Sequence, residues 1–158
     1  MDRRLIESYA AGAQRLVDAF AGLSYEQLHA YPIPGTWSLH QIAIHMMDSD
    51  LIGADRMKRI AAMDKPLLCN YDETAFNELP GTDKLDTQAA CQIFALNRAL
   101  TATILHSLPD SSFQRFGIHD EVGKVTLADL VGKYVAHLDG HLQHVYRKRE
   151  LLGVASNS

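Results

Sequence analysis

The residues of this chain best suited to chemistry are three histidines in its C-terminal part. His137, His141 and His144 occur in the segment HLDGHLQH, at positions i, i+4 and i+7. At about 100° per residue, these spacings would put all three imidazoles on one face of an α-helix. Two imidazoles one helical turn apart can direct their nitrogens at a common ion, as in zinc motifs of the H-E-x-x-H type. The pair alone is also compatible with polar residues on a partly exposed helix face.

A further histidine stands alone in a distant part of the chain. His45 interrupts the apolar run IAIHMM, residues 42–47, and is therefore expected to be at least partly buried. A buried imidazole needs a polar partner, which can be a hydrogen-bonding group of the core or a metal ion. If the helix of His45 faces the helix of His137 and His141, the three imidazoles can bind one metal ion, which accounts for both the buried histidine and the pair. We therefore predict one divalent metal ion between these three residues.

Three protein ligands would leave a coordination position for water or substrate, which is the arrangement of catalytic sites rather than structural ones. Such a metal can lower the pKa of its water to about 7, or bind a thiolate directly. Asp48 lies three residues after His45 and shares its side of the predicted helix. Its carboxylate could orient an imidazole or act as a base, and a plain surface charge is the alternative that the spacing leaves open.

These side chains require helices to position them, and the first two helices are indicated by apolar periodicity and by a cap. Residues 24–37 carry two prolines and a glycine, so this segment is predicted to be a connector. Ser38 and Gln41 form a capping-box pattern, so a second helix should run from there to about Met63. The first helix is predicted over residues 3–22, where apolar side chains recur at steps of three and four: Leu5, Tyr9, Ala13, Leu16 and Phe20.

Two more helices follow a long connection. Residues 65–83 predict a crossover loop with one helical turn, and residues 113–125 favour extended backbone around a turn, compatible with a small β-hairpin. Thr126 followed by Asp129 marks the start of the last helix, which continues toward Leu152. The third helix, residues 84–107, is indicated by Ala89, Ile93, Leu96, Leu100 and Ile104. The last is indicated by Leu127, Leu130, Tyr134, Leu138, Leu142 and Val145.

These patterns predict an all-α fold, a four-helix bundle with long crossover connections and a small hairpin before the last helix, over residues 1–158 as one domain. The helices should bury their apolar stripes against each other, and bundle cores commonly build metal sites from facing helices. Trp37, just before the second helix, is expected to pack over the start of that helix.

Composition narrows the classes of partner. The chain has 158 residues, 47% hydrophobic and 22% charged, which is typical of a globular protein. A net charge of −4 gives no basic surface for nucleic acid, so no nucleic-acid partner is expected. The longest segment without a charged residue, 27–47, contains two prolines and three histidines, so no membrane span is expected. The N-terminal residues lack the apolar segment of a secretory signal, so a cytoplasmic location is expected.

Two segments also resemble a known family. The string WSLHQIAIHMMD, from Trp37 to Asp48, together with HLDGHLQHV, from His137 to Val145, resembles the DinB/YfiT superfamily. The resemblance covers nearly the whole chain, including FGIHDEVGKVTL before the last helix. It implies a four-helix bundle, commonly dimeric, with a divalent metal held by the residues here numbered His45, His137 and His141. Some members carry an Arg- or Gln-centred string after the final ligand, whereas this chain has LQH, so the resemblance does not define the substrate.

The resemblance also implies a class of function. Relatives include S-transferases that use small-molecule thiols and proteins described as metal-dependent hydrolases. The chain is therefore expected to be a metal-dependent transferase or hydrolase that acts on a small molecule. As a transferase it would use a small-molecule thiol as co-substrate. We expect a homodimer, with zinc or nickel as the metal. His144 would be a general base or an alternate ligand, supported by Asp48; surface positions are the alternative for both. Two further alternatives stay open: a dimeric, non-catalytic stress-response module that binds metal or a small ligand, and a bundle whose histidines bind nothing.

Overall fold

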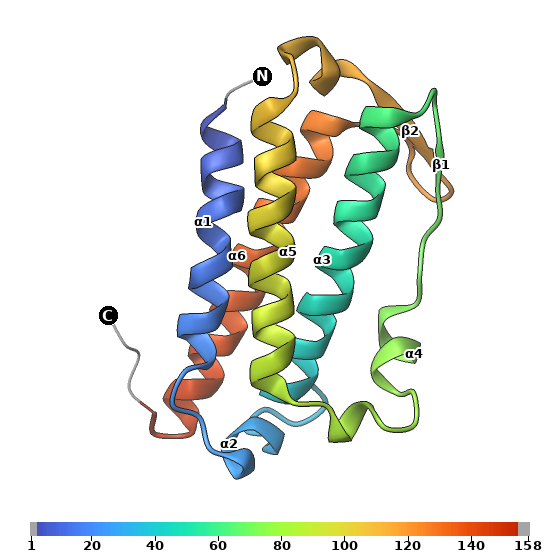
Figure 1. Ribbon diagram of the computed structural model, residues 1–158. Coiled ribbons are helices and arrows are strands. Elements are labelled where there is room, and N and C mark those ends of the chain that lie inside the picture. Colours follow the sequence, from blue (N-terminus) through green and yellow to red (C-terminus); the bar gives the residue numbers. More distant parts are fainter. Residues whose placement is uncertain (1–2, 155–158) are drawn as a thin grey trace.

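Four long helices form a bundle in the computed structural model, which describes residues 3–154 (Figure 1). The helices are α1 (Arg4–Phe20), α3 (Leu39–Ala62), α5 (Thr87–Ser107) and α6 (Leu127–Leu151). α5 packs between α1 and α3 in front of α6 in the view of Figure 1, and α6 contacts α1 and α3 from the opposite side. The predicted four-helix bundle is therefore confirmed. No helix among residues 3–154 combines the length and apolar character needed to cross a membrane.

The long helices begin at the residues that the sequence indicates. The side chain of Ser38 accepts a hydrogen bond from the backbone of Gln41, and the side chain of Gln41 accepts one from the backbone of Ser38, which completes a capping box at the start of α3. Thr126 and Asp129 do the same for α6. These caps satisfy backbone N–H groups that a helix start leaves without partners, so they fix where each helix begins.

The chain crosses the length of the bundle between α3 and α5, because these two helices run in the same direction (Figure 1). The connection carries the strand β1 (Leu67–Leu68), the short helix α4 (Glu73–Asn77) and the 3₁₀ turn η1 (Thr82–Lys84). α4 packs against α3, which is the helix of His45. The predicted long crossover is confirmed, and it places a polar segment of chain beside the outer face of α3.

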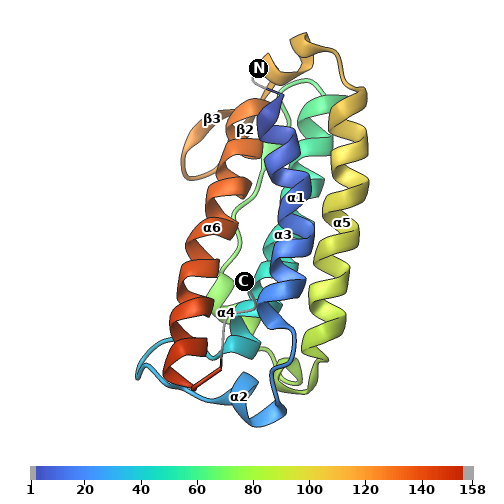
Figure 2. The same ribbon diagram turned by 90° about the vertical axis from the view of Figure 1, so that its left-hand side faces the viewer.

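A small sheet covers the beginning of α6, after the 3₁₀ turn η2 (Asp110–Gln114) that follows α5. β2 (Phe116–His119) and β3 (Gly123–Thr126) pair antiparallel, and Figure 2 shows this hairpin beside the upper end of α6. The predicted hairpin is therefore confirmed. β1 adds to β2 in parallel, with Leu67 opposite Ile118. This pairing was not predicted, and neither was α2 (Tyr25–His29), a helix of one turn inside the segment expected to be a connector.

The apolar stripe that indicated α5 does not face the core, which corrects the expectation that every stripe is buried. Ile93, Leu96, Leu100 and Ile104 are 43%, 65%, 68% and 41% exposed. The opposite face of the helix is buried instead, through Ala90, Cys91, Phe94, Ala102 and Leu105. Both faces of α5 are apolar at helical spacing, so periodicity predicts the helix without selecting the side that packs.

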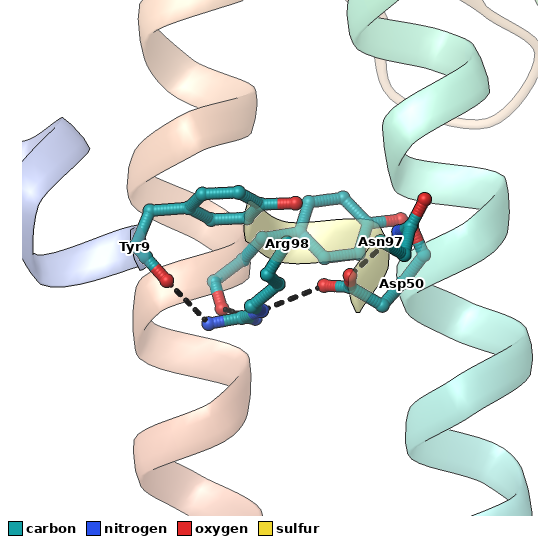
Figure 3. A network of polar contacts seen from close by, with 5 residues as sticks. Tyr9, Asp50, Asn97 and Arg98 are labelled. Carbon is teal, nitrogen blue, oxygen red and sulfur yellow. Dashed lines mark hydrogen bonds and ion pairs between the residues drawn. The ribbon is translucent and has the colours of Figure 1, made fainter. Parts of the chain in front are cut away.

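A buried polar network joins the four long helices at mid-height (Figure 3). Arg98 of α5 is 0% exposed, and its Nε donates to Oδ1 of Asp50 on α3 at 2.8 Å. Its two terminal nitrogens donate to the carbonyl oxygens of Tyr9 on α1, at 3.4 Å, and Tyr134 on α6, at 2.7 Å. The amide of Asn97 donates to the other oxygen of Asp50 at 2.8 Å. One guanidinium therefore holds all four helices in register, and its charge is matched by a buried carboxylate.

Candidate metal centre

His45 of α3 and His137 and His141 of α6 converge between their two helices. One nitrogen atom from each ring lies within 4.8 Å of the other two. The Nε2 atoms of His45 and His137 are 3.1 Å apart, close to the roughly 3.3 Å expected of two ligands on a tetrahedral ion with bonds of about 2.0–2.1 Å. The ring centre of His141 is 4.8 Å from that of His45 and 4.6 Å from that of His137. The structure thus brings together the three residues predicted as ligands.

A close contact between the two helices lies next to this cluster. The ring of Tyr134, one turn before His137, rests directly on Gly53 of α3. A Cβ atom at position 53 would meet a ring carbon at 2.3 Å, so a larger residue would push the ring and α6 away. The absence of a side chain at Gly53 therefore allows α3 and α6 to approach closely enough for their imidazoles to share an ion.

Burial keeps the three imidazoles neutral. It lowers the pKa of His45 to about 4 and that of His137 to about 3, with the neighbouring rings adding to the shift. Burial also lowers the pKa of His141, and His144 contributes. At pH 7 each ring therefore offers a lone pair to a metal ion. Nδ1 of His45 and Nδ1 of His141 are buried without a hydrogen-bond partner among residues 3–154, so part of the hydrogen-bonding capacity of the cluster is unsatisfied there. Three neutral imidazoles of this kind fit a divalent transition metal.

Trp37 forms one wall of the site. Its ring centre lies 4.9 Å from that of His45, and its plane is within 8° of the plane of His141 at 6.5 Å. The ring also packs against the buried cluster at this end of the bundle, as expected from its position before α3. Its apolar surface therefore limits the access of water to two of the three imidazoles.

Glu73 is an acidic neighbour that the sequence did not reveal. Its Oε2 lies 3.7 Å from Nε2 of His45, and the side chain is 56% exposed. Because His45 is neutral at pH 7, this contact is not an ion pair; it puts a carboxylate beside the nitrogen that faces the cluster. The sequence signals only a helix start here, through the cap that Asp72 makes to Ala75. The crossover, and not local spacing, brings Glu73 to the histidines.

Asp48 and His144, the other predicted site residues, are not part of the three-histidine cluster. Nδ1 of His45 has no partner, so Asp48 does not orient that ring through a hydrogen bond. Asp48 is partly buried, which raises its pKa, and its charge acts on Tyr71 of the crossover. His144 is exposed, with its ring centre 6.4 Å from that of His141. Neither residue joins the three imidazoles as a ligand, and catalytic roles for them stay predictions.

Two cavities open beside the three imidazoles. The larger, about 530 Å³, reaches His137 and has a polar lining of residues from α3, α6 and the crossover: Ser49, Arg56, Asn70, Tyr71, Asp72, Glu73, Lys133 and Tyr134. The smaller, about 190 Å³, reaches His141 and has a mainly apolar lining with two polar ends: Ile33, Thr36, Trp37, Ile42, His144 and Lys148. A concave surface with a few convergent polar groups is typical of small-molecule sites.

Known proteins resemble this chain in fold, and several of these relatives are named as metal-dependent. The model of the DinB superfamily matches residues 8–145. A Bacillus subtilis (strain 168) protein named "Putative metal-dependent hydrolase YfiT" is 25% identical over 140 residues, which are 88% of this chain and 79% of that protein. A Bacillus mycoides (strain KBAB4) protein with the same description is 27% identical over 137 residues, which are 87% and 79% of the two chains. The solved structure of YfiT from Bacillus subtilis, described as a four-helix bundle of unusual topology, matches with a TM-score of 0.90 at 24% identity. The match covers 96% of this chain and 87% of that one.

Proposed function

This chain belongs to the DinB superfamily, and we propose that it is an enzyme that depends on one divalent metal ion held by His45, His137 and His141. The observation that carries the proposal is the convergence of three neutral imidazole nitrogens within 4.8 Å. A divalent ion with three protein ligands keeps a coordination position for water or substrate and makes a nucleophile available at neutral pH. Zinc or nickel is the proposed metal, because both accept imidazole ligands.

Hydrolysis is the first candidate reaction, since the relatives above are named metal-dependent hydrolases. In this proposal Glu73 accepts the proton of the nucleophile, because its carboxylate stands 3.7 Å from a ligand nitrogen at the mouth of the larger cavity. Trp37 shields the imidazoles on the other side. The substrate is a small molecule, because a cavity of about 530 Å³ falls within the range of small-molecule sites.

Transfer to or from a small-molecule thiol is the second candidate, and the two cavities favour it. A hydrolase needs one organic substrate, whereas an S-transferase must hold an acceptor and a thiol at the same time. The larger cavity reaches His137 and the smaller one His141, so two molecules can approach the same ion from different sides. A soft metal-bound thiolate also suits zinc or nickel.

We also propose a homodimer that pairs through α5. The exposed side chains Ile93, Leu96, Leu100 and Ile104 form an apolar stripe along this helix. Arg98 is the one charged residue between Thr87 and Leu105, and it is buried, so the stripe is electrically neutral. A neutral apolar stripe can meet its own copy across a two-fold axis without like charges facing each other. The stripe lies on the side of α5 away from the imidazoles, so pairing there leaves the metal centre accessible.

The metal assignment is tested by elemental mass spectrometry of the purified protein and of His137→Ala and His141→Ala. About one ion per chain is expected in the wild type and in the control His106→Ala, whose ring lies at the end of α5, and none in the two ligand variants. Trp37 is the single tryptophan of the chain, so its fluorescence should be quenched by nickel in the wild type and not in His141→Ala. Full metal retention in both ligand variants would refute the site.

Removing the metal with a chelator distinguishes the enzyme hypothesis from the hypothesis of a non-catalytic module. For the proposed enzyme, removal of metal should abolish turnover of ester or thiol substrates while circular dichroism still reports most of the helicity, because the four helices have their own apolar core. Loss of the fold on chelation, with no turnover by the metal-loaded protein, would favour a module in which the ion serves stability or binding.

A further inference from the structure

A second buried guanidinium, that of Arg56 on α3, has no acidic partner. The residue is 5% exposed, and no carboxylate among residues 3–154 lies within 4 Å of its nitrogens. One terminal nitrogen donates to the carbonyl oxygen of Cys69, and the guanidinium also hydrogen-bonds to Tyr134. Nε has no partner in the part of the chain that the structure describes. The neighbouring Tyr134 is uncharged at pH 7, since burial raises its pKa. Arg56 therefore differs from Arg98, whose buried charge is matched by Asp50.

A buried charge without a counter-charge costs several kcal/mol, and proteins keep one only where something compensates it. Arg56 lines the larger cavity, the same cavity that reaches His137. A molecule that fills this cavity can contact both the guanidinium of Arg56 and the ring of His137. An anionic group on that molecule would supply the missing counter-charge.

Arg56 lies on the same face of α3 as His45 of the histidine cluster. His45, Ser49 and Arg56 fall within about 40° of each other around the axis of α3, because their spacings are close to whole turns. The eleven positions from His45 to Arg56 correspond to a rise of roughly 16 Å at 1.5 Å per residue. Ser49 and Tyr134 also line the cavity. A molecule that lies along this cavity can therefore place an anionic group at Arg56 and a reacting group near His137.

We propose that Arg56 binds a terminal carboxylate of the substrate or thiol co-substrate while the other end of that molecule reacts at the metal centre; this rests on the proposed function. The planar guanidinium matches a carboxylate with two parallel hydrogen bonds. Lys133, exposed at the cavity mouth, adds attraction for an anion. Asp72 and Glu73 line the same cavity and disfavour a dianion, which makes a carboxylate a better fit than a phosphate.

The test compares mercaptoundecanoate with mercaptoundecanol on the cobalt-loaded protein, where the thiolate-to-cobalt absorption band reports binding. The wild type should bind the carboxylate at least about tenfold more tightly, a ratio equal to 1.4 kcal/mol. Arg56→Met should reduce this preference to about one. The control Arg59→Met, whose exposed guanidinium pairs with Asp55 one turn away, should keep the full preference. An unchanged preference in Arg56→Met would overturn the proposal.

A purely structural role for Arg56 predicts a different pattern: a lower melting temperature in Arg56→Met with the carboxylate preference intact. If Arg56→Met does not fold, Arg56→Lys replaces it, because lysine keeps the charge but not the paired hydrogen bonds. Arg56→Lys should lose part of the preference, and full retention of the preference would count against the proposal.

Experiments on the metal-free protein distinguish failure of the Arg56 proposal from failure of the proposed metal centre. If cobalt does not bind at all, the proposed function fails, and Arg56 is then tested with octanoate and octanol by calorimetry. Octanoate should bind the wild type and Arg59→Met more tightly than octanol does, and this difference should vanish in Arg56→Met. Equal binding of octanoate and octanol to the wild type, or tighter binding of inorganic phosphate than of octanoate, would overturn the carboxylate assignment.

Discussion

Replacing Asp50 with Asn should lower the free energy of unfolding by about 3–5 kcal/mol, the usual result when one member of a buried ion pair is removed. Asp50 and Arg98 are 1% and 0% exposed, and their Nε–Oδ1 contact is 2.8 Å. The asparagine keeps the shape and one acceptor oxygen but removes the charge. The guanidinium of Arg98 is then left with neutral partners, the carbonyl oxygens of Tyr9 and Tyr134 among them.

This loss is a large part of the roughly 5–15 kcal/mol by which a native protein is stable. For a chain of this size 1 kcal/mol shifts the melting temperature by about 2–4 °C, so Asp50→Asn should melt roughly 6–20 °C lower. Thermal unfolding followed by circular dichroism measures the shift. The control is Asp55→Asn on the exposed side of the same helix, which should melt close to the wild type because its pair with Arg59 is solvent-exposed.

A double variant sharpens the test. Asp50→Leu combined with Arg98→Met removes both charges at once, so it should be less destabilised than Asp50→Leu or Arg98→Met alone. A double variant that loses the sum of the two single effects would show that the pair has no energetic coupling. In that case the network of Figure 3 holds the helices together by packing and not by charge.

The loss of stability caused by Arg98→Met should depend on pH. Burial raises the pKa of Asp50, and the guanidinium of Arg98 opposes the shift. Without the guanidinium, the carboxyl of the folded protein binds its proton more tightly than the carboxyl of the unfolded chain does, so folding is favoured at low pH. The stability of Arg98→Met should therefore fall, relative to wild type, as the pH rises above roughly 4, the ordinary pKa of Asp. A flat difference between pH 4 and pH 7 would contradict this account.

Two further predictions concern the site and the surface. Glu73→Gln should lower turnover of an ester substrate by about 10²–10⁴-fold, because a general base is lost, while the metal content stays unchanged. The control Glu78→Gln, at the end of α4, should keep full turnover. Equal rates in both variants would show that Glu73 takes no part in the reaction. Leu96→Lys in the exposed stripe of α5 should convert a dimer into a monomer in analytical ultracentrifugation, while Ser8→Lys on α1 should not; a wild-type monomer would exclude pairing through α5.

Local signals in the sequence determined the helices and the three candidate ligands. The capping boxes at Ser38 and Thr126 depend only on side chains three residues apart, so they were readable without a structure. The spacing of His137 and His141 fixes a shared face in any α-helix. His45 was identifiable because a polar side chain inside an apolar run needs a partner. The β-hairpin before α6 was likewise marked by local residue types.

Tertiary structure decided what local spacing cannot encode. α5 has two apolar faces, and only its packing between α1 and α3 selects the one that is buried. Glu73 reaches His45 because the crossover returns along α3. Among the described residues, no segment that packs around Arg56 brings a carboxylate within 4 Å of it. Helical periodicity acts over a few residues, whereas burial and charge pairing depend on segments far apart in sequence. The sequence therefore determined which residues can bind a metal, and the fold determined which acid, cation and cavities surround it.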